Sequence, residues 1–120
     1  MKFTGAYGEC SKSDVSVCSS VITYEDKGNR QSFEVRYPES VQKEIASRFS
    51  IPEESIVHIL SLACLIKYPE YKHRSKILLS KEEILLVFED LNINAVQNLY
   101  RDIHELGGVE IESTLIYFEE

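Results

Sequence analysis

The sequence lacks the apolar segments that carry a chain across or into a membrane. Residues 1–13 have little periodicity, form at most a short strand or a loose start, and contain no apolar core of a signal peptide. The longest apolar stretch, residues 56–66, is interrupted by His58 and Ser61 and is much shorter than the ~20 residues that span a bilayer. We therefore expect a soluble cytoplasmic protein with no membrane partner.

Cysteines are few, and their number is odd: Cys10, Cys18 and Cys64 cannot all pair within one chain. Cys64 lies inside the apolar stretch and is interpreted as a buried small hydrophobic residue. Cys10 and Cys18 could in principle meet. We nevertheless expect no disulfide, because a reducing cytoplasm keeps thiols free.

Metal-binding and catalytic motifs are also absent. His58, His73 and His104 have no cysteine, histidine or carboxylate at a repeated zinc-like spacing, and His58 is expected to be a hydrogen-bonded core residue. The chain contains no G-x-S-x-G, phosphate-binding glycine loop or H-E-x-x-H. We therefore expect no cofactor, no metal site and no enzyme activity; a catalytic site assembled from distant residues is the third-ranked alternative.

The composition is that of a globular protein, with 43% apolar and 28% charged residues, and its length favours a single domain over residues 1–120. Residues 14–24 are rich in β-branched side chains, and residues 33–37 alternate apolar with polar, so both predict strands. Residues 26–29, where Gly28 and Asn29 can take positive φ, predict the turn of an antiparallel hairpin.

Four helices are expected after this hairpin. An apolar stripe predicts the first helix over residues 41–49. Ser50 and Glu53 form a capping-box pattern that opens a second helix over residues 51–68. This second helix is apolar almost all round, so we expect it at the centre of the fold, covered on several sides.

Ser80 opens a third helix through another capping box, after a short strand at residues 77–79. Asn94 is predicted to cap the fourth helix, and Gly107 to end it. Residues 109–118 alternate as one strand or a tight hairpin. The order of strands, four helices and a final strand predicts an α+β fold with an antiparallel sheet.

Basic residues are scarce in the last third of the chain. The formal net charge is -7, yet residues 1–80 contain 11 basic and 10 acidic residues, whereas residues 81–120 contain two basic and ten acidic ones. Such a surface repels nucleic acid and attracts basic proteins. The alternative is a solvated acidic surface that only keeps the protein soluble.

Residues 77–118 resemble a winged helix-turn-helix in the order of their elements. In the helix that would enter the DNA groove, Gln97, Asn98 and Arg101 are side chains that can read bases. Acidic side chains in the same segment would face phosphate: Asp102, Glu105, Glu110 and Glu112. A DNA-binding regulator is therefore the second hypothesis.

Residues 67–76 carry lysines and an arginine between tyrosines, which predicts an exposed basic and aromatic loop. Aromatic rings among lysines can stack on nucleic-acid bases. The alternative that we favour is a solvated connector.

The first hypothesis is a non-catalytic acidic protein that neutralises a basic protein partner such as a nuclease toxin. In this general character the chain resembles bacterial immunity proteins, antitoxins and phage anti-defence proteins. The expected partner-binding residues are Glu82, Glu89, Asp90, Asp102, Glu105, Glu110, Glu112 and Tyr117. Tyr117 would be an aromatic anchor, whereas we expect Tyr100 to pack in the core.

Overall fold

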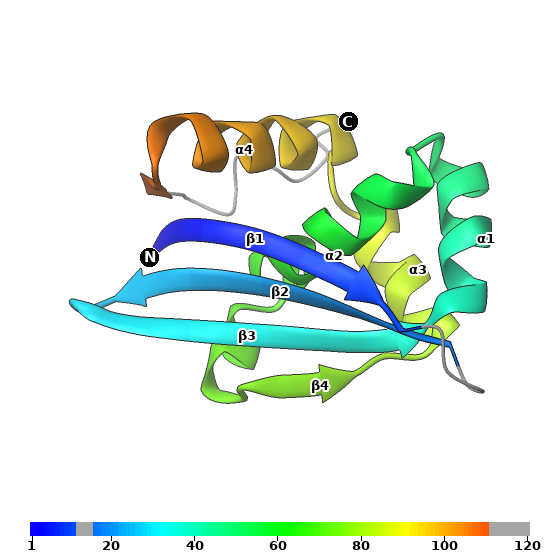
Figure 1. Ribbon diagram of the computed structural model, residues 1–120, viewed down its shortest axis with the longest axis horizontal. Helices are drawn as coiled ribbons and strands as arrows, with labels where there is room; N and C mark the ends of the chain where they lie inside the picture. Colours follow the sequence, from blue (N-terminus) through cyan, green and yellow to red (C-terminus); the bar gives the residue numbers. More distant parts are fainter. Residues whose placement is uncertain (12–15, 111–120) are drawn as a thin grey trace.

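The structure is a computed structural model that describes residues 1–11 and 16–110, and it confirms the predicted α+β class (Figure 1). Its strands form one sheet in the order β4-β3-β2-β1-β5. The elements run along the chain as β1 (Lys2–Cys10), β2 (Val17–Asp26), β3 (Asn29–Pro38), α1 (Glu39–Phe49), α2 (Glu53–Lys67), the short 3-10 helix η1 (Pro69–His73), β4 (Lys76–Leu78), α3 (Lys81–Glu89), α4 (Ile93–Leu106) and β5 (Val109–Glu110).

The predicted hairpin is present as β2 and β3, which pair antiparallel over their whole length. Its turn differs in one position from the prediction. Asp26 pairs with Asn29, so the two-residue loop consists of Lys27 and Gly28, with φ values of 53° and 81°. Positive φ at both loop positions matches the right-handed twist of the flanking strands, and Asn29 belongs to β3 instead.

β1 is a nine-residue strand, longer than the short strand or loose start that the sequence predicted. Its glycines weakened the strand signal, yet Gly8 has a structural reason. A Cβ atom at Gly8 would lie 2.3 Å from the backbone oxygen of Val57, because α2 crosses β1 at this point. The residue that lowers strand propensity is therefore the one that lets the central helix approach the sheet.

β4 is a correction to the predicted antiparallel sheet, because it pairs parallel to β3. The chain leaves β3 at Pro38, forms α1, α2 and η1, and crosses back so that Lys76 pairs with Glu34 and β4 runs in the same direction as β3. A connection of this length is what a parallel pairing requires. The sheet is therefore mixed, with a three-residue parallel edge strand.

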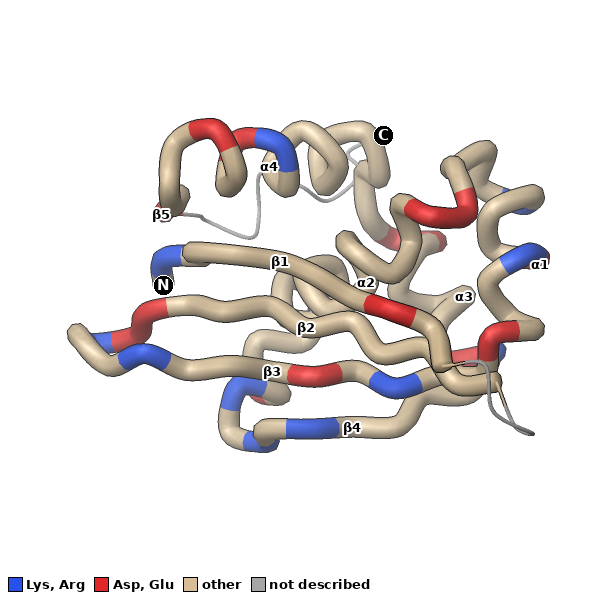
Figure 2. Tube along the Cα trace, in the orientation of Figure 1, with Lys and Arg blue, Asp and Glu red and all other residues tan. Residues whose placement is uncertain are grey.

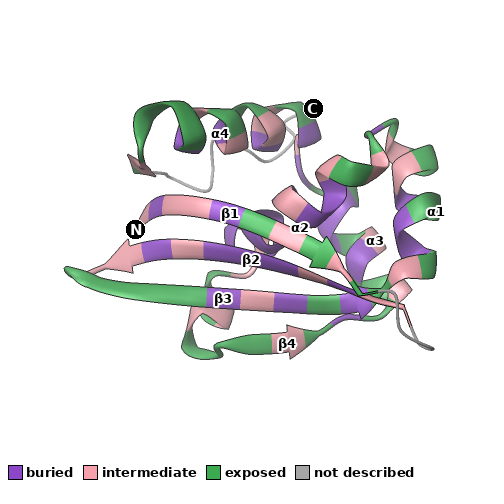
Figure 3. Ribbon diagram, in the orientation of Figure 1, coloured by how far each residue is buried: buried purple, intermediate pink, exposed green. Residues whose placement is uncertain are grey.

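Helix α2 is the centre of the fold, as predicted. It runs behind β1 and β2 in the view of Figure 1 and is buried along nearly its whole length (Figure 3). A buried polar contact joins it to the sheet, where the Ser20 and Ser61 hydroxyls lie 3.0 Å apart and the Ser61 amide donates to Ser20 Oγ. No described element covers the opposite face of the sheet (Figure 1).

The turn between α1 and α2 corrects the predicted capping box at Ser50. Ser50 has φ 54° and ends α1 in the left-handed conformation, and the amide of Ile51 donates to the carbonyl of Ala46. Ser50 therefore serves the preceding helix, and α2 begins after Pro52 without a side-chain cap. The apolar periodicity was right, but the serine closes one helix instead of opening the next.

The two later helices confirm one predicted cap and correct another. Ser80 forms the full capping box with Glu83 at the start of α3. Asn92, two residues before the predicted Asn94, accepts from the amide of Ala95 and caps α4. Gly107, with φ 71°, ends α4 as predicted.

The cysteines and His58 require two further corrections. Cys10 and Cys18 lie directly opposite each other in the β1–β2 register and form a disulfide, whereas we expected free thiols. Cys64 is free and buried, as predicted. His58 is half-buried against the ring of Tyr100, and its Nδ1 has no hydrogen-bond partner among the described residues, so it is not the hydrogen-bonded core histidine that we expected.

The C-terminal part differs from a winged helix in its strand pairing. In a winged helix the strand before the helices joins the sheet of the wing, whereas β4 and β5 lie at opposite edges of this sheet. β5 pairs with β1, and the remainder of the predicted strand or hairpin at 109–118 lies outside the described residues.

Within residues 1–11 and 16–110, no single helix is both long and apolar enough to cross a membrane. The pair α1 and α2, bent by 95°, meets the criteria of length and composition when taken together. Most of α2 is buried inside the fold.

Candidate functional site

The acidic side chains expected to bind a partner fall into two groups in space (Figure 2). Glu82, Glu89 and Asp90 are exposed on α3 or directly after it. Asp102 and Glu105 lie in the second half of α4, next to β5 with Glu110. Glu112 and Tyr117 lie outside the described residues, and the rest do not form one continuous face.

A pocket of about 250 Å³ lies beside the first group, where the turn between α1 and α2 meets the turn between α3 and α4. We call it the helix-junction pocket. Apolar side chains line much of it: Phe49, Ile51, Phe88, Leu91 and Ile93. Polar side chains complete the lining: Ser50, Glu89, Asn92, Asn94 and Gln97.

The apolar part of the pocket belongs to the hydrophobic core. Phe88 and Leu91 are fully buried, and the ring of Phe49 packs on that of Phe88 with centroids 5.5 Å apart. The positions of these side chains are therefore set by core packing. The amides of the rim can both donate and accept hydrogen bonds, as an extended peptide requires.

Glu89 is the charged group of the pocket, and its partner comes from α1. Arg48 Nη2 donates to Glu89 Oε1 over 2.8 Å, and the same guanidinium lies 5.8 Å from the centre of the Phe49 ring. Both side chains of the ion pair are about half exposed. Such an exposed pair stabilises a fold by about 0–1 kcal/mol, so a competing cation can replace Arg48 at little cost.

Further carboxylates lie close to the pocket in the sequence and in the fold. Glu53 and Glu54 occupy the first turn of α2, directly after Ile51 and Pro52. Their negative charges there interact favourably with the positive end of the helix dipole. Asp90 follows Glu89 and forms an ion pair with Lys67. The surroundings of the pocket are therefore acidic, although two of the carboxylates already have cationic partners.

The second group lies on α4 and β5, and none of its residues lines the helix-junction pocket. Arg101 and Asp102 form a loose ion pair at 3.9 Å, and Glu110 lies 3.3 Å from the amino group of Met1. Glu105 is exposed beside Leu106, which is 72% exposed. Two of its three carboxylates therefore already have a cationic partner.

Four basic residues lie on or near β4 and form what we call the β4 edge: Arg36, Lys72, Arg74 and Lys76 (Figure 2). Glu34 forms ion pairs with Arg36 at 2.6 Å and with Lys76 at 3.9 Å. Lys72 pairs with Asp26 at 3.3 Å. Three of the four cations of this edge therefore have a carboxylate partner on β2 or β3, and the two carboxylates balance about half of its positive charge.

The tyrosines of residues 67–76 do not form the exposed aromatic surface that we expected. Tyr71 is half-buried and stacks on Phe33 with ring centroids 6.2 Å apart, and Tyr68 packs on Tyr71. Tyr24 also donates from its hydroxyl to the carbonyl of Lys72. These rings hold η1 against the core, so they are not free to stack on nucleic-acid bases.

Tyr100 packs against the core, as predicted. Its ring lies between His58 and His104, with centroid distances of 5.6 and 4.6 Å. In the part of the chain that the structure describes, no three His, Cys, Asp or Glu side chains could hold a metal ion together.

Sequence reasoning identified Glu89 but missed the rest of the pocket. Phe49 was placed in a core stripe, and Arg48 had no sequence signal that linked it to Glu89, 41 positions away. Asn94 was interpreted only as a helix cap, and Gln97 only as a side chain that could read bases. The one usable signal was the pair of short interhelical turns with polar residues between apolar stripes.

Comparison of the chain with models of protein families, with curated protein sequences and with solved structures found no match. The function must therefore be argued from the site itself.

Proposed function

We propose that the protein is a non-catalytic binding protein that neutralises a basic protein partner in the cytoplasm, of the immunity-protein or antitoxin type, and that the helix-junction pocket is the centre of its interface. One observation carries the proposal: an apolar pocket, bordered by amides, has an exposed carboxylate that already holds a guanidinium. Protein interfaces concentrate their energy in such central pockets, and arginine and aromatic residues are the commonest anchors.

Arg48 illustrates the chemistry of the expected anchor. Its guanidinium pairs with Glu89 and lies near the face of the Phe49 ring, so charge and ring contact act together. An arginine of the partner would take this position, and a neighbouring aliphatic side chain would enter the pocket. Glu53, Glu54 and Asp90 would then increase the association rate of a basic partner.

The test is a titration of the ¹⁵N-labelled protein with two short peptides, one of alternating arginine and leucine and one of alternating glutamate and leucine. We expect the arginine peptide to shift the amide signals of Phe49, Phe88, Glu89 and Asn92 in a saturable manner. The binding should weaken as salt is raised from about 0.05 to 0.3 M, because exposed charges are screened.

Two results would reject the proposal. One is an equal response to the glutamate peptide, which would leave only apolar contact. The other is a set of shifts centred on the β4 edge, which would place the binding surface on basic residues instead of at the acidic helix junction.

A native partner should be sought with the intact protein as bait, beside a Glu89→Gln bait and a Glu25→Gln control bait. Glu25 is a partly exposed glutamate in an ion pair with Arg30 at 3.9 Å, and it does not line the helix-junction pocket. A partner bound through the pocket should be recovered by the wild-type and control baits and depleted from the Glu89→Gln bait.

A further inference from the structure

The disulfide between Cys10 and Cys18 closes the end of the β1–β2 pair at the point where residues 11–16 connect the two strands. Its two sulfur atoms have different surroundings. Cys10 is half-buried, whereas Cys18 has no exposed surface. A reagent in solution can therefore reach the pair through Cys10 only.

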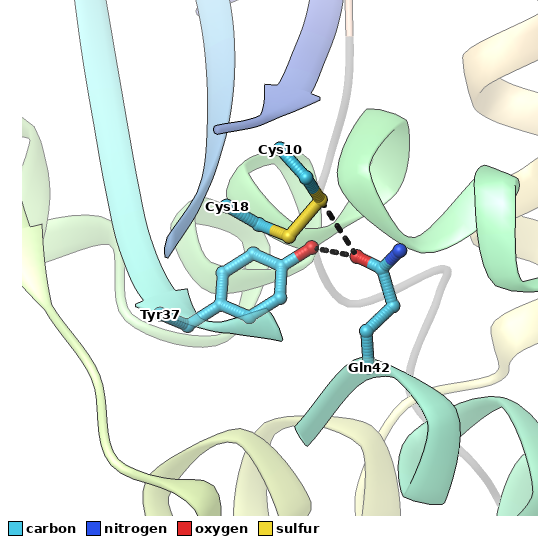
Figure 4. Close-up of a disulfide and its surroundings, with 4 residues drawn as sticks. All are labelled: Cys10, Cys18, Tyr37 and Gln42. Atoms are coloured by element: carbon cyan, nitrogen blue, oxygen red, sulfur yellow. Dashed lines mark hydrogen bonds between the residues drawn. A yellow bond between two sulfur atoms is a disulfide. The ribbon is translucent and has the colours of Figure 1, made fainter. Parts of the chain in front are cut away.

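A carboxamide on α1 lies beside the pair (Figure 4). Gln42 is 5% exposed, and its Oε1 accepts a hydrogen bond from the hydroxyl of the buried Tyr37. Cys10 Sγ lies 3.9 Å from the same Oε1. A disulfide sulfur has no proton to donate, but a Cys10 thiol at this position can donate to the second lone pair of the oxygen.

The site therefore accommodates both oxidation states of the pair. In the disulfide form, β1 and β2 are joined covalently, and Gln42 Oε1 accepts a hydrogen bond from the Tyr37 hydroxyl alone. In the dithiol, the covalent link is lost and the Cys10 thiol contributes a hydrogen bond to α1. The link between the sheet and α1 changes with the oxidation state, and the packing of Tyr37 need not change.

We propose that Cys10 and Cys18 form a reversible thiol–disulfide pair whose exchange partner is a low-molecular-weight disulfide of the glutathione class. The Cys10 thiolate attacks one sulfur of the small disulfide, whose S–S bond breaks to release one thiolate. The Cys18 thiolate then attacks Cys10 Sγ in the resulting mixed disulfide and releases the second thiolate of the small molecule. Two protein thiols become one disulfide, the small disulfide is reduced to two thiols, and the two protein protons pass to them.

Cys64 takes no part in this exchange. It is fully buried among the core residues, and this burial raises the pKa of its thiol well above the ordinary value. A thiol that is neither exposed nor ionised does not react with a small disulfide. It provides an internal reference for alkylation in the native state.

The test uses the full chain equilibrated with defined ratios of reduced to oxidised glutathione, followed by rapid alkylation and peptide mass spectrometry. We expect Cys10 and Cys18 to lose and regain alkylation together as the ratio changes, with Cys64 alkylated only after denaturation. The dithiol form should melt roughly 5–15 °C below the disulfide form, since closing a short loop restricts the unfolded chain.

Two variants separate the steps. Cys18→Ser should stop at a mixed disulfide of Cys10 with one glutathione, because no second thiol is present to release it. Gln42→Leu removes the acceptor of the Cys10 thiol and should move the midpoint two- to tenfold toward the disulfide. Cys64→Ala is the matched control and should leave the midpoint unchanged.

The proposal is overturned if Cys10 and Cys18 are alkylated at every glutathione ratio. It is equally overturned if the native disulfide persists in excess dithiothreitol, because the pair would then be permanent. If Cys18→Ser does not fold, the wild-type titration and the Cys64→Ala control still decide between these outcomes. None of these measurements depends on the helix-junction pocket.

Discussion

The helix-junction pocket and the β4 edge are both surfaces of paired charges, but they differ in what lies beneath the charges. At the β4 edge, Glu34 and its cations lie on a packed sheet, and the rings of Tyr68 and Tyr71 pack against the core. At the helix junction, the ion pair of Glu89 borders an open cavity with an apolar lining. Under the proposed function, charge alone does not make a binding site, and the cavity is the feature that distinguishes the helix junction from the β4 edge.

Folding also reduces the charge asymmetry that separates the two parts of the sequence. Arg48 and Lys67, from the first 80 residues, pair with Glu89 and Asp90 of the last third. The excess of acid over base in residues 81–120 is therefore partly neutralised in space. What distinguishes the helix junction is the local arrangement more than the net charge of a segment.

The largest expected effect is on binding at the helix junction. Reversing both charges, as Glu89→Lys with Asp90→Lys, places cations beside Arg48 and Lys67. The affinity for the arginine–leucine peptide should then fall at least about tenfold. The matched reversal at the β4 edge, Arg74→Glu with Lys76→Glu, should change its affinity less than about twofold. Peptide titrations by fluorescence anisotropy measure both, and equal losses would remove the distinction between the two surfaces.

The next effect is on the stability of the helix that forms one wall of the pocket. Asn92→Ala removes the side-chain cap of α4 and should lower the free energy of unfolding by about 1 kcal/mol. Asn94→Ala, at an exposed position inside the helix, should change it by less than about 0.5 kcal/mol. Urea unfolding of both variants measures this, and a larger loss for Asn94→Ala would restore the cap predicted from sequence.

A smaller effect is expected at the turn that forms the opposite wall. Ser50 holds φ 54° at the end of α1, a conformation that glycine adopts without steric cost. Ser50→Gly should therefore stabilise the protein by about 0.5–1 kcal/mol. Thermal unfolding followed by circular dichroism checks the sign. A destabilised Ser50→Gly variant would mean that the serine hydroxyl, and not the backbone geometry, is important at this turn.

The smallest effect is expected at the β4 edge. Arg74→Ala with Lys76→Ala removes exposed cations and should change the free energy of unfolding by no more than about 0.5 kcal/mol. The same variant tests the second functional hypothesis. Strong binding of duplex DNA by the wild type in a low-salt gel shift, lost in this variant, would favour nucleic acid over a basic protein.

Local patterns in the sequence were sufficient for the elements whose signal is a nearby repeat. The hairpin of β2 and β3, the central apolar helix and the capping box at Ser80 all depend on residues a few positions apart. Glu89 was identified in the same way, as an acidic residue on a predicted helix.

Features that depend on distant residues could not be obtained in this way. Gly8 has the appearance of a strand breaker until α2 is seen to cross it, and the disulfide of Cys10 and Cys18 requires the exact β1–β2 register. The parallel pairing of β4 with β3 is a contact between segments about 40 positions apart, and so is the ion pair of Arg48 with Glu89.

The sequence by itself therefore determined the class of fold, the central helix and the uneven distribution of charge, because periodicity and composition are local properties of a chain. Only the tertiary structure decided which charges are neutralised, which cysteines meet and where a cavity remains open. These features depend on contacts between residues that are far apart in the sequence. Such contacts leave no local sequence pattern and form only when folding brings the distant segments together.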